Sequence, residues 1–131
     1  MSALKDYTKG KWKDYELYAP SEFWEMSVIE RNKISNGCGS AQAAIDFVPD
    51  TNFLLDISAA CDIHDVGYYL GGLKEDKYIS DLFLLINNLQ IIRQHGGNII
   101  ITTFRYSRAI KYFYTVDYFG DDSFNFIKPI N

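Results

Sequence analysis

Residues 60–72 read ACDIHDVGYYLGG and place a cysteine, two aspartates and a histidine among apolar and aromatic residues. On a helix turning 100° per residue, His64 and Tyr68 lie on one mainly apolar side. Asp65 lies at the edge of that side, and Asp62 points roughly away from it. A half-buried imidazole with a carboxylate beside it is suited to act as a general base next to a cation ligand. The simpler alternative is a core histidine satisfied by a neighbour, with Asp65 solvated.

The composition indicates one folded domain over residues 1–131. Hydrophobic residues make up 47% of the chain and aromatic residues 16%, which is enough for a core and argues against disorder. The net charge is −4 and no run of lysine or arginine is present. We therefore expect no nucleic-acid partner and no simple electrostatic docking on anionic lipid.

The N-terminal residues 1–18, MSALKDYTKGKWKDYELY, contain no uninterrupted apolar stretch, so no secretory signal peptide is visible. The longest apolar runs, such as LFLLI at 82–86, are too short to span a membrane. Cys38 and Cys61 form either one disulfide or two free thiols. Without a visible export signal, free thiols are the expectation.

Apolar periodicity, with glycine and proline as punctuation, predicts helices over residues 22–33, 54–70, 75–94 and 99–116. Ser21 is the expected N-cap of the first helix. Residues 1–19 are expected to form an irregular arm, and residues 41–53 to be irregular as well. The predicted fold class is therefore all-α, or mainly α, with two long helices followed by a third C-terminal helix.

The second long helix adds a carboxylate to the histidine site. The helical face count puts Asp81 at the core-facing edge and Asp76 on the polar side. A short Gly-Gly turn should make the two long helices pack antiparallel. Asp81 is then placed to accept a hydrogen bond from one ring nitrogen of His64, leaving the other free to take a proton. The alternative is that Asp81 acts as a cap or bridges to a nearby lysine.

A glycine-rich loop precedes these helices and reads SNGCGS at 35–40. Such a loop can turn several backbone carbonyls toward one point, and calcium binds carbonyl and carboxylate oxygens together. Asp65 is the candidate carboxylate. Taken alone, Gly-Cys-Gly is usually only a turn. A bond between Cys38 and Cys61 would hold this loop next to His64.

Three features, NGCGS at 36–40, ACDIHDVGYY at 60–69 and Asp81 on the following helix, resemble the phospholipase A2 superfamily. The similarity is closest to its small, cysteine-poor members of bacteria and viruses, including particle-borne ones. The motifs cover roughly residues 35–85. Two features depart from the family pattern. Secreted members carry many disulfides, whereas this chain can make at most one. The loop usually has another glycine where this chain has Ser40 or Ala41.

The resemblance implies calcium-dependent hydrolysis of the sn-2 ester of phospholipids at a membrane surface. His64 would be the general base that activates water, Asp81 would orient His64, and Tyr68 would hydrogen-bond to Asp81. Calcium would polarise the ester carbonyl and stabilise the oxyanion. The implied calcium ligands are the carboxylate of Asp65 and the backbone carbonyls of Ser35, Gly37 and Gly39.

Three other functions compete with this interpretation. A catalytically silent calcium- or lipid-binding module keeps the fold and can keep the loop but does not require His64, Asp81 and Tyr68 together. A cysteine–histidine hydrolase with Cys61 as nucleophile and His64 as base leaves Asp65 and the glycine loop unexplained. A purely structural particle or interaction protein is the third.

The implied calcium chemistry carries an expectation about location. Calcium sites of this loop type are weak, so we expect the protein to act outside the cytosol, where calcium is abundant. Because no signal peptide is visible, delivery on a particle or by a dedicated export route is expected.

Overall fold

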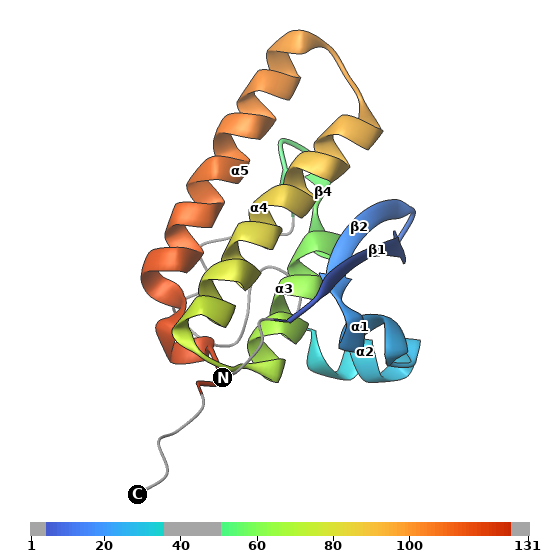
Figure 1. Cartoon of the computed structure of the whole chain (residues 1–131). Helices are drawn as coiled ribbons and strands as arrows, with labels where there is room; N and C mark the ends of the chain where they lie inside the picture. The colour runs from blue at the N-terminus through green and yellow to red at the C-terminus, as the bar shows by residue number, and fades with distance from the viewer. Residues whose placement is uncertain (1–4, 36–50, 127–131) are drawn as a thin grey trace, which may run out of the picture.

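The computed structural model describes residues 5–35 and 51–126, which are mainly helical with two small β-hairpins (Figure 1). The helices are α1 (Ser21–Glu25), α2 (Val28–Ile34), α3 (Ser58–Leu70), α4 (Lys74–His95), α5 (Ile99–Phe119) and the short 3₁₀ helix η2 (Gly120–Ser123). The strands are β1 (Tyr7–Trp12), β2 (Tyr15–Pro20), β3 (Thr51–Asn52) and β4 (Leu55–Asp56). The prediction of a mainly α chain is confirmed, although the hairpins mean that it is not all-α.

The three long helices pack side by side, with α4 in contact with both α3 and α5 (Figure 1). The chain reverses direction between α3 and α4 at Gly71 and Gly72, whose φ angles of 68° and 134° favour glycine. A side chain at Gly71 would also collide with the backbone oxygen of Asn125. The predicted glycine stop after α3 is therefore confirmed, and it places α3 against α4.

The N-terminal arm is not irregular as expected, because β1 and β2 form an antiparallel hairpin. Its turn residues Lys13 and Asp14 both have positive φ, which is typical of a tight hairpin turn with the right-handed twist of the strands. The Asn87 side chain on α4 accepts from the amide of Tyr18 and donates to its carbonyl, both at 2.8 Å. The strands are short, and β1, which reads YTKGKW, carries little apolar alternation, so the sequence pattern did not reveal the hairpin.

The helix predicted over 22–33 is two helices, and Ser21 does not cap either of them. The N-cap position of α1 is Pro20, without a side-chain cap. Ser27 begins α2 instead: its hydroxyl accepts from the Glu30 amide at 3.1 Å, and the Glu30 carboxylate accepts from the Ser27 amide at 3.3 Å. This reciprocal capping box explains why a new helix begins at this point.

The helix predicted to begin at residue 54 begins at Ser58, because β3 and β4 form a second hairpin before it. Phe53 and Leu54 make its turn with positive φ. The Asp56 carboxylate then accepts from the amide of Ser58 at 2.8 Å. This contact satisfies one of the free amides at the start of α3.

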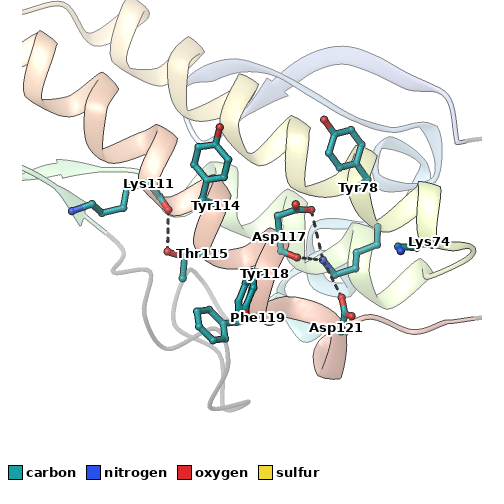
Figure 2. A pocket seen from close by; sticks show the side chains of 10 residues that line it. Lys74, Tyr78, Lys111, Tyr114, Thr115, Asp117, Tyr118, Phe119 and Asp121 are labelled. Atoms are coloured by element: carbon teal, nitrogen blue, oxygen red, sulfur yellow. Dashed lines mark hydrogen bonds and ion pairs between the residues drawn. The ribbon is translucent and has the colours of Figure 1, made fainter.

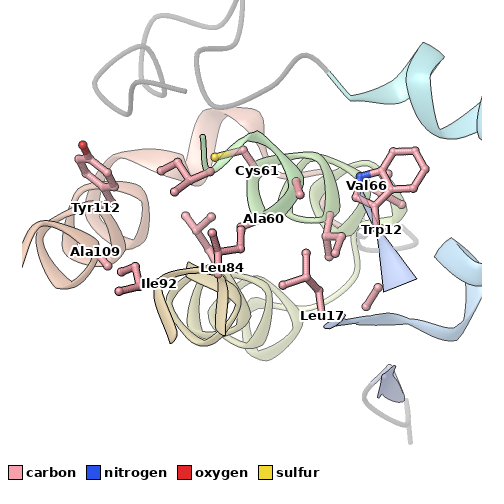
Figure 3. Packing of buried hydrophobic residues seen from close by; sticks show 14 of the residues in the cluster. Trp12, Leu17, Ala60, Cys61, Val66, Leu84, Ile92, Ala109 and Tyr112 are labelled. Carbon is pink, nitrogen blue, oxygen red and sulfur yellow. The ribbon is translucent and has the colours of Figure 1, made fainter. Parts of the chain in front are cut away.

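The hydrophobic core joins the first hairpin to the three long helices (Figure 3). Leu17 from β2, Val66 from α3, Leu84 from α4 and Val116 from α5 are all buried within one cluster. This packing fixes the relative position of the helices that carry the candidate site. In residues 5–35 and 51–126, no helix combines the length and the apolar character needed to cross a membrane.

Candidate active site

Asp81 on α4 is completely buried and accepts hydrogen bonds on both carboxylate oxygens. Its Oδ1 accepts from Nε2 of His64 at 2.8 Å and from the Tyr68 hydroxyl at 2.5 Å. Its Oδ2 accepts from the ammonium of Lys77 at 2.8 Å. These four residues, His64, Tyr68, Lys77 and Asp81, are called the Asp81 array below.

The helical repeat brings the members of the array together in pairs. His64 and Tyr68 lie one turn apart on α3, and their ring centroids are 4.2 Å apart. Lys77 and Asp81 lie one turn apart on α4. Residues four apart share a helix face, so packing α3 against α4 brings the two pairs into contact. The hydrogen bond predicted between His64 and Asp81 is present, and Asp81 rather than Asp76 makes it.

The surroundings keep Asp81 ionised despite its burial. Burial acts to raise the pKa of this carboxyl group, but hydrogen bonds from His64, Lys77 and Tyr68 and the charge of His64 lower it overall. Burial and the charge of Asp81 raise the pKa of Tyr68. Tyr68 therefore stays a phenol that donates to the carboxylate.

Sequence reasoning did not assign a role to Lys77. Its side chain is only 4% exposed, and its ammonium donates to the backbone carbonyls of Val116 at 3.4 Å and Asp117 at 3.1 Å. It also lies 3.4 Å from the Asp121 carboxylate. The lysine bridge that was kept as an alternative for Asp81 is thus present together with the histidine contact. The Lys-x-x-x-Asp spacing on a helix was the available signal.

An open cavity of about 790 Å³ lies between α4 and α5 and reaches the array through Lys77 (Figure 2). Its walls include Tyr78 on α4, Tyr114 and Asp117 on α5, and Asp121 in η2. His64 and Tyr68 do not line this cavity. The cavity therefore borders the lysine side of the array.

Two aspartates that the face count placed away from the histidine side are buried. Asp62 accepts from the Trp12 indole at 3.1 Å and pairs with Lys13 at 2.7 Å beneath the first hairpin. Asp76 accepts from the Leu73 amide at 2.9 Å at the start of α4. Asp76 was expected on the polar side of the helix, and the exposure that this implies is wrong. Its carboxylate folds back onto the N-terminus of α4 and is buried there.

The calcium site expected from the resemblance is only partly within the described residues. Asp65 is partly exposed on α3, directly after His64, and Ser35 is the C-cap of α2, which packs against α3. Gly37 and Gly39 lie outside the described residues. Within the described part, no three His, Cys, Asp or Glu side chains gather to hold a metal. The expected donor set has one carboxylate and three backbone carbonyls, and calcium binds such oxygen ligands. This donor set does not require a cluster of three His, Cys, Asp or Glu side chains.

Cys61 is disulfide-bonded, so the expectation of free thiols is wrong for this residue. A disulfide sulfur has no thiolate and cannot act as a nucleophile. The cysteine–histidine hydrolase is therefore excluded in this state of the protein.

No family model, curated protein or solved structure matches the chain.

Proposed function

We propose that this protein is a calcium-dependent hydrolase of the phospholipase A2 type, which cleaves the sn-2 ester of phospholipids. The observation that supports this most is the contact between Nε2 of His64 and the buried carboxylate of Asp81 at 2.8 Å. A buried, ionised partner with an additional tyrosine donor suits the role of orienting a general base. The resemblance assigns the oxygen donors for calcium to Asp65 and to the carbonyls of the glycine loop.

Asp81 selects the basic atom of His64. Because the carboxylate accepts from Nε2, the ring proton resides there and Nδ1 carries the lone pair. Among residues 5–35 and 51–126, no residue hydrogen-bonds to Nδ1. Nδ1 is therefore the atom that takes a proton from water, and Asp81 stabilises the imidazolium that forms.

The chemical step is then a direct attack by water. Water gives its proton to Nδ1 while its oxygen bonds to the ester carbonyl carbon. The tetrahedral intermediate collapses with cleavage of the bond to the glycerol oxygen, which takes the proton from the imidazolium. The products are a fatty acid and a lysophospholipid, and no covalent enzyme intermediate forms. Calcium held by Asp65 and the loop carbonyls would supply polarisation of the ester carbonyl when bound.

The rival proposal is a catalytically silent calcium- or lipid-binding or structural module with the same fold. The ion pair between Lys77 and Asp81 favours it, because this pair gives Asp81 a role in stability that does not depend on His64. The contact between His64 and Asp81 also fits the rival proposal, because a buried histidine in a protein core needs a hydrogen-bond partner even without a catalytic role. Activity measurements separate the two proposals.

The deciding experiment is fatty-acid release from mixed phospholipid vesicles, with calcium and with a chelator. We expect calcium-dependent release that falls by about 10²–10⁴-fold in His64→Ala, because the general base is removed. His95→Ala is the matched control, since His95 is exposed near the end of α4 and should leave release unchanged. A folded protein that releases no fatty acid under any lipid or calcium condition would support the silent module, and calorimetric calcium titration would follow.

The proposed partner is a phospholipid membrane surface, and the proposed place of action is outside the cytosol. Delivery would occur on a particle or through a dedicated export route. The disulfide at Cys61 is consistent with an oxidising environment. Finding the protein free and active in a calcium-poor cytosol would contradict this proposal.

A further inference from the structure

Lys77 is the one buried member of the Asp81 array that the proposed mechanism leaves without a task. Lysine is rarely buried unless it is paired, and its ammonium here lies within hydrogen-bond distance of the Asp81 carboxylate. Removing such a charge from water is costly, so its position demands close partners. The question is whether Lys77 serves stability alone or also the chemistry of His64.

The two oxygens of Asp81 have separate partners on different helices. Oδ1 faces α3, where it accepts from His64 and Tyr68, and Oδ2 accepts from Lys77 on α4 itself. A carboxylate can rotate about the bond to its Cβ atom. Hydrogen bonds to both oxygens prevent this rotation and keep Oδ1 directed at Nε2 of His64.

Lys77 is in turn held by α5. Its ammonium donates to the carbonyls of Val116 and Asp117 in the last turn of that helix, and Asp121 lies 3.4 Å away. The C-terminal end of a helix favours a cation because free carbonyls point outward there. A continuous set of contacts therefore runs from the end of α5 through Lys77 and Asp81 to the imidazole on α3.

We propose that Lys77 is a positioning residue for His64, which acts by holding the Asp81 carboxylate in the orientation that receives the Nε2 proton. Lys77 does not touch the substrate, and its effect passes through Asp81. This inference rests on the proposed hydrolase function for its kinetic consequence. Its structural consequence, the tautomer of His64, holds whether or not the protein is an enzyme.

The test compares Lys77→Met with a matched control, Lys74→Met. Lys74 is on the same helix and lines the same cavity, but it is exposed and forms no ion pair among the described residues. Vesicle hydrolysis is measured as kcat and KM separately, and the His64 tautomer is read from nitrogen-15 NMR of the imidazole. Thermal unfolding checks that each variant is folded, and Lys77→Leu, which also lacks a donor, replaces Lys77→Met if that variant does not fold.

We expect Lys77→Met to lower kcat by about tenfold or more with little change in KM, as is typical for groups that orient a catalytic histidine. We also expect the NMR signals to change from the Nε2–H form to a mixture of tautomers. Lys74→Met should match the original protein in both measurements. A folded Lys77 variant with kcat within twofold of the original protein, or with an unchanged tautomer, would overturn the inference.

A double variant shows whether the effect passes through Asp81. If it does, adding Lys77→Met to Asp81→Asn should not lower kcat further, because the orienting carboxylate is already gone. A further loss as large as that in the single variant would overturn the inference. If the original protein hydrolyses no lipid, the hydrolase proposal fails, and the NMR comparison alone decides whether Lys77 positions the imidazole.

Discussion

Asp81 contacts each of the other three members of its array and is the residue on which the candidate site depends. Its carboxylate is buried, so its hydrogen bonds are not weakened by competing water. His64 and Tyr68 approach one oxygen and Lys77 the other. Changes at this scale should therefore alter both stability and the proposed activity.

The ionisation of Asp81 should make the stability of the protein depend on pH in acid. The pKa of Asp81 in the folded protein is lowered from its ordinary value of 3.8, because its hydrogen bonds outweigh the effect of burial. The stabilisation from ionised Asp81 is fully present above about pH 4 and is lost as the pH falls through the lowered pKa. Asp81→Asn should reduce the free energy of unfolding at neutral pH and make its decline in acid shallower.

Chemical denaturation at a series of pH values would measure this effect. Asp14→Asn is the control, because Asp14 is exposed in the hairpin turn and asparagine accepts its positive φ. An acid decline that is equally steep in Asp81→Asn and in the original protein would contradict the prediction.

The hydroxyl of Tyr68 should contribute to the stability of the folded protein. Tyr68→Phe keeps the ring but removes the hydroxyl that donates to Asp81. A hydrogen bond to a charged group contributes about 1.5–3 kcal/mol, so the free energy of unfolding should fall by about that amount. Tyr69→Phe, on the exposed side of the same helix, should change it by less than about 0.5 kcal/mol. Equal effects in urea titrations of the two variants would show that the Tyr68 contact contributes nothing specific.

At the scale of elements, Ser27 separates two short helices. The predicted single helix fails because the chain bends at Met26, whose ψ of 147° is extended. The capping box then starts α2, and Arg31 in that helix donates from its Nε to the Phe23 carbonyl at 2.7 Å. Local side-chain capping and this tertiary contact together decide where the helices end.

Ser27→Ala should destabilise the protein by about 1 kcal/mol, because the Glu30 amide loses its acceptor. Ser21→Ala is the comparison, since Ser21 caps no helix and its hydroxyl makes only an exposed contact of 3.3 Å with Asp6. Thermal or urea unfolding would measure both variants. A larger loss in Ser21→Ala than in Ser27→Ala would show that the capping assignment is incorrect.

At the scale of the whole molecule, the first hairpin is part of the core and not a loose arm. Leu17 on β2 is 0% exposed and packs in the same cluster as the long helices. Trp12 at the end of β1 donates its indole proton to Asp62 of α3. The hairpin therefore helps to hold α3 and α4 in the positions that form the Asp81 array.

Leu17→Ala should lower the free energy of unfolding by about 2–5 kcal/mol, because it removes a buried side chain and leaves a cavity. Leu54→Ala is the matched control, since Leu54 is 96% exposed at the tip of the second hairpin. Urea denaturation should show a change of less than about 0.5 kcal/mol for the control. A loss of under about 1 kcal/mol in Leu17→Ala would mean that the hairpin is peripheral to the core.

The long helices and the contact between His64 and Asp81 follow from local signals in the sequence. Helical periodicity and the glycine pairs at 71–72 and 96–97 predicted α3, α4 and α5 to within a few residues, because these signals are local. The face count selected Asp81 as the partner of His64, since helical geometry alone decides which residues share a side. The roles in catalysis and calcium binding stay predictions.

The hairpins, the burial of Lys77 and the disulfide at Cys61 became visible only in the folded structure. Whether a segment forms a strand depends on packing against residues far away in the sequence. For example, the Asn87 side chain on α4 forms hydrogen bonds with both the amide and the carbonyl of Tyr18 in β2. Lys77 looks like a solvated lysine until the end of α5 supplies the carbonyls that satisfy it. Burial of a charge depends on partners far away along the chain, and a sequence pattern within one helix contains no information about them.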